Sequence, residues 1–183
     1  MCLPLEFAPE QGVIQTRFVS AALLALRLLI GGAAAKQSLA GLPQQVAEAL
    51  ERFDAGPLLA ATHRVYLGRG WRYGLAMAAA VHLQESALMV PEAHRTLEYR
   101  HGPLAAADSR TLLWCFDSPE EAESAAVLAE VGRTGAAVRC PADDPLVSLV
   151  QAQLLAVRLA TAHGLDLDAP RHLRRAIVIA SPE

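Results

Sequence analysis

The spacing of apolar residues divides the chain into segments of helical and of strand character. Apolar positions recur three and four residues apart between 13 and 29 and again between 38 and 53, which predicts two amphipathic helices. Gly31 and Gly32 are expected to end the first helix. The stretch 54–57, which contains Asp, Gly and Pro, is expected to follow the end of the second.

The rest of the chain alternates between short apolar runs and longer helix-like stretches. The apolar runs predict buried strands at 63–67, 111–116 and 136–140, with a last short strand at 176–180. Helices are expected at 72–89, 119–131 and 146–163. This alternation is typical of an α/β fold with a mainly parallel sheet, preceded here by one or two helices.

Composition and charge narrow the classes of protein that fit. Hydrophobic residues make up 53% of the chain, which is ample material for a core. Only 5% of residues are aromatic and the net charge is -3, so a nucleic-acid surface is not expected. The apolar run 19–32, about 14 residues long, is too short to span a bilayer. With no secretory signal at the N-terminus, a cytoplasmic protein with no membrane partner is expected.

The cysteines and histidines do not form a recognisable metal motif. Cys2, Cys115 and Cys140 have no metal-ligand spacing, and the histidines share no zinc pattern. Cys115 lies in an apolar run, where a buried strand residue is a more ordinary interpretation than a nucleophile. Neither a metal nor a cofactor is expected, since the turn at 68–70 also lacks the third glycine of a dinucleotide fingerprint.

A glycine turn and a polar helix face carry the candidate chemistry. Gly68, Arg69 and Gly70 follow a strand and precede a helix, where backbone amides can bind an anion, although a simple tight connection explains the same pattern. On the following helix His82 and Glu85 are three residues apart, and His101 comes later. A carboxylate and two imidazoles are suited to acid–base work on a small polar substrate, but a solvated helix face has the same residue types.

Several spaced motifs resemble the second sugar-isomerase (SIS) domain of the glutamine–fructose-6-phosphate aminotransferase family. A strand and a G-R-G turn open the segment, and H-L-Q-E at 82–85, two glutamates and H-G-P-L at 101–104 resemble the family's K-L-K-E … E … E … H-G-P-L signature. The ending Q-L-L-A … G-L-D-L-D-A-P-R at 153–171 is similar as well. The resemblance implies a three-layer αβα SIS domain at 56–183, preceded at 1–55 by helices like those that end a first SIS domain.

The resemblance also implies roles for individual residues. Glu85 matches the glutamate that moves a proton between C1 and C2 of an open-chain sugar phosphate, and His101 matches the histidine that assists ring opening in a neighbouring subunit. His82, Arg175 and the glycine turn would lie near the sugar. A hexose or amino-hexose phosphate is therefore the implied ligand, with a second copy or a partner SIS chain as the implied protein partner.

The sequence departs from the family at positions that bear on chemistry. His82 and Arg175 stand where the family has lysines, and Lys36 is the only lysine in the chain. Arginine cannot form an imine, so amino transfer is harder to sustain than proton transfer. The family's serine- and threonine-rich phosphate loop has no counterpart in the sequence. Three interpretations therefore remain open: a phosphosugar isomerase or deaminase/deglycase-like enzyme, a phosphosugar-binding or regulatory module without turnover, and a folded remnant that has lost its site.

Overall fold

A four-stranded parallel sheet forms the centre of the molecule, as a computed structural model that describes residues 4–174 shows. The strand order is β2-β1-β3-β4, and each neighbouring pair is parallel. The strands are β1 (His63–Gly68), β2 (Glu92–Arg95), β3 (Thr111–Cys115) and β4 (Ala137–Arg139). The predicted α/β fold with a mainly parallel sheet is confirmed, while the strand expected at 176–180 and Arg175 lie outside the described residues.

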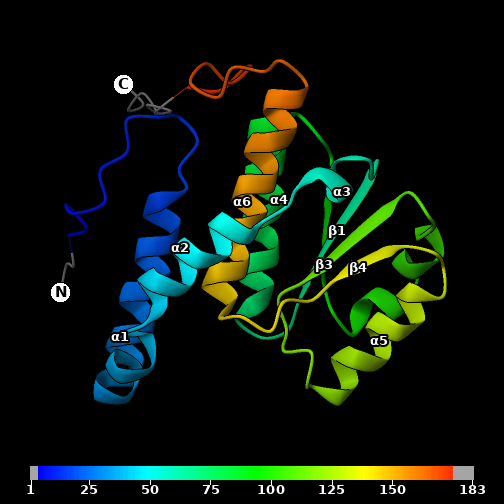
Figure 1. Cartoon of the computed structure of the whole chain (residues 1–183), viewed down its shortest axis with the longest axis horizontal. Helices are drawn as coiled ribbons and strands as arrows, with labels where there is room; N and C mark the ends of the chain where they lie inside the picture. The colour runs from blue at the N-terminus through cyan, green and yellow to red at the C-terminus, as the bar shows by residue number, and fades with distance from the viewer. Residues whose placement is uncertain (1–3, 175–183) are drawn as a thin grey trace, which may run out of the picture.

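Helices cover both faces of the sheet, which gives the three layers (Figure 1). On one face α4 (Arg72–Ala87) and α6 (Pro145–Ala162) pack against Tyr66 and Trp114, with α2 (Leu42–Arg52) outside them. On the other face α5 (Ala122–Gly132) covers Val65, Leu67 and Leu113. Successive strand residues point to opposite faces, so the apolar run 112–115 of β3 supplies both cores at once.

The strand β2 was not predicted, because its residues Glu92–Arg95 are polar and do not alternate. It forms at an edge of the sheet, where β1 supplies its backbone partners. Its side chains are held too: Glu92 accepts hydrogen bonds from the rings of His63 at 3.0 Å and His94 at 2.7 Å. Pairing with β1 therefore makes this segment a strand, although its residues have only a weak local preference for one.

Short helical turns occupy segments that the sequence left unassigned. The stretch expected to be a break contains α3 (Gly56–Leu59), and two 3₁₀ turns, η1 (Glu98–Arg100) and η2 (Pro103–Ala106), connect β2 to β3. The three longer helices of the SIS-like part lie close to their expected bounds.

The first helix is longer than predicted. Helix α1 (Arg17–Leu39) continues past Gly31, although Gly32 has non-helical angles (φ 54°, ψ -135°) and kinks it. Helices α1 and α6 are both long and apolar enough to cross a bilayer by length and composition alone. Most of α6 is buried in the core, and the kink leaves α1 with a straight part, 17–31, that is shorter than the about 20 residues a span requires. The absence of a membrane partner stays a prediction.

Helix α1 is fixed to the rest of the molecule at two points. Its N-terminus is capped by Glu10, which accepts hydrogen bonds from the backbone amides of Thr16, Arg17 and Phe18. Further along, Arg27 makes a two-point ion pair with Asp144, the N-cap of α6, at 2.7 and 2.8 Å. Helix α1 also exposes large apolar residues: Phe18, Leu26, Leu28, Leu29 and Ile30.

Candidate functional site

The C-terminal half of α4 places His82 and Glu85 side by side beside the segment that enters α1. Residues three apart on a helix project in similar directions, so both side chains reach the same groove. The groove has a volume of about 510 Å³ and is lined by Val13, Gln15, Val19, Met77, Ala78, Val81, His82 and Glu85. The pair that the sequence picked out by spacing is thus brought together in space.

The imidazole of His82 is buried and is held in one neutral form. Its Nε2–H donates to the backbone carbonyl of Gln15 at 2.9 Å, and its Nδ1 accepts from the amide of Gln153 at 3.3 Å. Because a carbonyl can only accept, the proton must be on Nε2. Burial lowers the pKa of His82, although the Gln15 carbonyl and the charge of Glu10 oppose that shift. His82 therefore offers the groove a positioned, uncharged ring rather than a cation.

The carboxyl group of Glu85 is half-buried among apolar neighbours. Burial raises its pKa above the usual value for a glutamate. Within residues 4–174 no hydrogen bond or ion pair holds this carboxylate, in contrast to most acidic side chains near the sheet. A carboxylate with a raised pKa, open to a groove and without a structural partner, is suited to accept and return a proton.

His101 lies on the other side of the sheet from Glu85. It follows η1, is exposed, and borders a separate groove of about 530 Å³ formed by Leu97, Arg100, His101, Ala122, Glu123 and Ala126. That groove adjoins α5, whereas Glu85 belongs to α4 on the opposite face. One chain therefore does not bring its two candidate acid–base residues together.

The glycine turn at 68–70 requires glycine for two different reasons. A Cβ on Gly68 would lie 2.4 Å from the carbonyl oxygen of Arg72, because the strand end and the first turn of α4 are in close contact. Gly70 has a φ of +51°, in the left-handed region that glycine adopts at little cost. The turn is thus a tight strand-to-helix connection, the ordinary alternative that the sequence left open.

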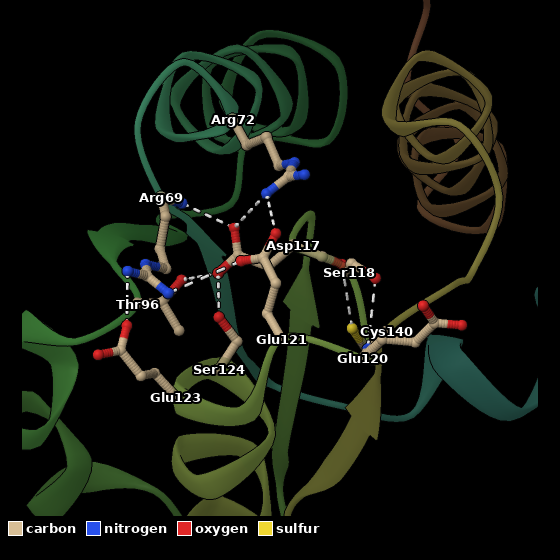
Figure 2. A network of polar contacts seen from close by, with 10 residues as sticks. All are labelled: Arg69, Arg72, Thr96, Asp117, Ser118, Glu120, Glu121, Glu123, Ser124 and Cys140. Atoms are coloured by element: carbon tan, nitrogen blue, oxygen red, sulfur yellow. Dashed lines mark hydrogen bonds and ion pairs between the residues drawn. The ribbon is translucent and has the colours of Figure 1, made fainter.

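Side chains of the same chain surround this turn and meet at Asp117 (Figure 2). The Asp117 carboxylate is fully buried and accepts hydrogen bonds from the Arg69 backbone N–H at 2.8 Å, from Thr96 Oγ at 2.6 Å and from Ser124 Oγ at 2.9 Å. Arg72 approaches it at 3.9 Å. These partners follow β1 and β2 or belong to α4 and α5, so one carboxylate joins four elements.

The guanidinium groups of this cluster are already paired. Arg69 forms an ion pair of 2.6 Å with Glu123, and Arg72 forms one of 2.6 Å with Glu121. Arg69 is a predicted substrate-binding residue, but its guanidinium group points toward α5 and is already engaged by Glu123. Sequence reasoning missed Asp117, although an acidic residue directly after the apolar run 112–116 is a recognisable signal for this edge of a parallel sheet.

No metal site is evident in the part of the chain that the structure describes. Residues 4–174 contain no group of three His, Cys, Asp or Glu side chains arranged to hold an ion. The predicted site residues within 4–174 occupy three places: His82 with Glu85 on α4, the turn at 68–70 beside Asp117, and His101 beside α5. Among them, Glu85 is the carboxylate that faces a groove without a partner in residues 4–174 and whose pKa is raised by burial.

Comparison with known proteins identifies relatives of this fold. A family model described as the SIS domain matches residues 58–169. The isomerizing glutamine–fructose-6-phosphate aminotransferase of Caulobacter vibrioides is 31% identical over 96% of this chain and 36% of its own length. The same enzyme from Shewanella oneidensis is 30% identical over 98% of this chain and 36% of its own.

Solved structures agree with this result. Glucosamine-6-phosphate deaminase from Thermotoga maritima superposes with a TM-score of 0.77 at 25% identity, over 93% of this chain and 59% of that one. Tagatose-6-phosphate ketose/aldose isomerase from Escherichia coli gives a TM-score of 0.69 at 16% identity, over 94% of this chain and 55% of that one, and shows the shared fold. The chain spans about a third of the curated relatives and somewhat more than half of the solved structures.

Proposed function

The chain belongs to the SIS domain family, and from this premise we propose that it acts on a hexose phosphate or amino-hexose phosphate, with Glu85 transferring a proton between C1 and C2. The substrate class is supported by the names of the relatives: an aminotransferase on fructose 6-phosphate, a deaminase of glucosamine 6-phosphate and an isomerase of tagatose 6-phosphate. The reaction type common to these names is chemistry at the carbonyl end of a phosphorylated sugar.

The observation that carries the proposal is the condition of the Glu85 carboxylate. It faces a groove, has no partner among the described residues, and its pKa is raised by burial. Abstracting a proton from carbon requires a base that is partly desolvated, since a fully hydrated carboxylate is too weak. The ring of His82 lies beside it, and because both ring nitrogens are bonded to Gln15 and Gln153, its role is to hold α4 against the segment before α1 and to line the groove.

Proton transfer is a better fit to these residues than imine chemistry. Where the family has a lysine, His82 is buried and neutral, and an imidazole cannot form an imine with a ketose. Isomerisation through an enediol needs only a base and a way to exchange the proton between carbons and oxygens. We therefore place aldose–ketose isomerisation ahead of amino transfer.

The direct test is the variant Glu85→Gln, assayed for interconversion of glucose 6-phosphate and fructose 6-phosphate. Loss of a general base typically costs about 10²- to 10⁴-fold in rate, and a loss in that range is expected. Exchange of the C2 proton of glucose 6-phosphate with deuterated water, followed by NMR, should fall in parallel. The control is Glu51→Gln, an exposed glutamate on α2, which should leave both rates unchanged. Equal rates in Glu85→Gln and wild type would refute the assignment.

A second function, sugar-phosphate binding in a site shared between chains, is favoured by the separation of Glu85 and His101. These residues lie on opposite faces of the sheet, and the sequence has no serine- and threonine-rich phosphate loop. A second copy could bring its His101 to Glu85, whereas the phosphate loop would have to come from a partner SIS chain, and the exposed apolar residues of α1 offer a surface for either. Without that partner the chain would bind a phosphosugar but not turn it over.

Two measurements distinguish these possibilities. The purified chain is titrated with fructose 6-phosphate, glucose 6-phosphate and glucosamine 6-phosphate, and a ligand bound only by the folded state raises the melting temperature. A shift without turnover favours the binding module, whereas turnover by the chain alone counts against it. If two copies share a site, mixing inactive Glu85→Gln and His101→Asn chains should restore about a quarter of the wild-type rate, because half of the mixed dimers' sites are intact.

A further inference from the structure

Two cysteines lie side by side where β3 and β4 end. The parallel register pairs Trp114 with Arg139, so Cys115 and Cys140 are the next residues on the two neighbouring chains. Both belong to the apolar cluster under α5, Cys115 within it and Cys140 packed against it. Neither is assigned a role by the proposed function, and both are free thiols.

The geometry at this position is compatible with a covalent bond between the two sulfurs. Adjacent strands are about 4.8 Å apart, and disulfides form across Cα separations of about 4.4–6.8 Å. The two thiols also interact directly through their side chains. Because β4 ends at Arg139, the backbone of Cys140 is not held in the ladder and can adjust to the bond.

We propose that Cys115 and Cys140 form an oxidation site, at which a small peroxide converts the two thiols into an intramolecular disulfide. The site is a property of the sheet edge and does not depend on which sugar phosphate the protein takes. Its co-reactant is a hydroperoxide, which supplies the oxidising equivalents that the protein itself lacks.

The different exposure of the two cysteines sets the order of the steps. Cys140 is half-buried and reachable from solvent, whereas Cys115 is fully buried. The interaction with Cys115 lowers the pKa of Cys140, while that same interaction and burial raise the pKa of Cys115. Since a thiolate is the form that reacts, Cys140 is attacked first and Cys115 acts as the resolving thiol.

The chemistry balances in two steps. The Cys140 thiolate attacks one oxygen of the peroxide, the O–O bond breaks, and hydroxide leaves with the electron pair and is protonated to water. Cys140 is then a sulfenic acid. The sulfur of Cys115, losing its proton, attacks the sulfur of Cys140, and the S–OH bond breaks to release a second water. One hydrogen peroxide oxidises two thiols and yields one disulfide and two waters.

A bond here would act on the Asp117 network. The Cys140 thiol donates a hydrogen bond to the backbone carbonyl of Asp117 at 3.3 Å, and Figure 2 shows Cys140 beside Ser118 near that residue. Forming the disulfide removes this thiol proton and ties the segment before α6 to the end of β3. The carboxylate of Asp117 holds the backbone of Arg69, so oxidation is transmitted to the glycine turn.

The test uses the full chain carrying Cys2→Ser, so that only the two proposed thiols remain. After treatment of the folded protein with hydrogen peroxide, the mass should fall by two hydrogen atoms. Trypsin should then release peptides 111–133 and 140–158 as one cross-linked species that separates on reduction. Recovery of both peptides uncrosslinked, or of disulfide-linked dimers through Cys140, would overturn the proposal.

Two single variants establish the order of reaction. In Cys115→Ala the resolving thiol is missing, so Cys140 should stop at the sulfenic acid and be labelled by dimedone. In Cys140→Ser the buried Cys115 should stay reduced under the same treatment. The Cys140→Ser chain keeps the core residue intact, so its result stands even if Cys115→Ala folds poorly. Oxidation of Cys115 in Cys140→Ser at the wild-type rate would contradict the assigned order.

Discussion

Asp117 and Glu85 are both acidic side chains on the strand–helix framework, but the structure treats them in opposite ways. Asp117 is fully buried at the carboxyl end of β3 and is surrounded by donors from four elements. Glu85 is half-buried near the end of α4, opens to a groove, and has no partner among the described residues. The first carboxylate has its hydrogen-bonding capacity filled by the fold. The Glu85 carboxylate keeps its hydrogen-bonding capacity available for a ligand.

Whether a carboxylate has hydrogen-bond partners in the fold distinguishes a structural role from a catalytic one better than residue type or spacing does. Residue type alone does not distinguish the two carboxylates in the sequence. Satisfied partners indicate that a buried charge holds elements together, because removing it would leave several donors without an acceptor. A desolvated but unpaired carboxylate costs stability and is retained where chemistry needs it.

The largest expected effect is on Asp117. Replacing it in Asp117→Ala leaves the Thr96 and Ser124 hydroxyls and the Arg69 amide without their acceptor. Breaking a buried charged network costs about 3–5 kcal/mol in unfolding free energy, measurable by urea denaturation. The exposed Asp143 provides the control, and Asp143→Ala should change stability by less than about 0.5 kcal/mol. Similar small losses in both variants would remove the contrast between the two carboxylates.

A smaller loss is expected from Gly68→Ala, which tests the packing beside Asp117. The added Cβ would lie 2.4 Å from the Arg72 carbonyl, and overpacking of this kind costs about 1–3 kcal/mol. Gly74, also near the start of α4, has open space around its position, so Gly74→Ala should stabilise by up to about 1 kcal/mol. A lower melting temperature for Gly68→Ala and a higher one for Gly74→Ala, each relative to the wild type, would show that steric contact makes the turn require glycine.

The smallest effect is the pH dependence of Glu85. Its folded pKa is raised by burial, so the protonated form is favoured by folding. Compared with Glu85→Gln, the wild type should be relatively most stable below the unfolded value of 4.5 and lose that advantage as pH rises through the folded pKa.

Glu92 provides a comparison of opposite sign. Burial would raise its pKa, but hydrogen bonds from His94 and His63 outweigh that effect and lower it. Relative to Glu92→Gln, the wild type should therefore gain stability above the unfolded value of 4.5 and lose it as pH falls through the folded pKa. Urea denaturation between pH 3 and 7 measures both differences, and parallel trends in the two would contradict the expected contrast.

Much of the fold could be predicted from sequence because its two central strands contain apolar runs and the turn after β1 contains glycine. The segments around Val65 and Leu113 are buried on both faces, so their composition alone indicates a central parallel strand. The polar strand β2 could not be found in this way, since its strand form depends on pairing with β1. The extension of α1 beyond Gly31 could not be predicted either. The two glycines are typical of a helix end, but the helix resumes after one non-helical residue, Gly32.

The candidate site was predictable only where its residues are near in sequence. His82 and Glu85 share a helix face by spacing, and the structure places them in one groove. The partners of His82, Gln15 and Gln153, come from the two ends of the chain and have no local signal. In the same way, spacing cannot reveal that Thr96 and Ser124 converge on Asp117.

The strand order places the Asp117 network at the point where the winding of the sheet reverses. In the order β2-β1-β3-β4 the chain proceeds outward from β1 to β2 and then returns to place β3 on the other side. Open parallel sheets have a crevice where the winding reverses in this way, beyond the carboxyl ends of the two central strands, and ligands commonly enter there. Here Arg69 follows β1 and Asp117 follows β3, the two strands that border this position, and the backbone N–H of Arg69 donates to the Asp117 carboxylate. Hydrogen-bonding groups that a ligand would use at this position are therefore already paired with each other.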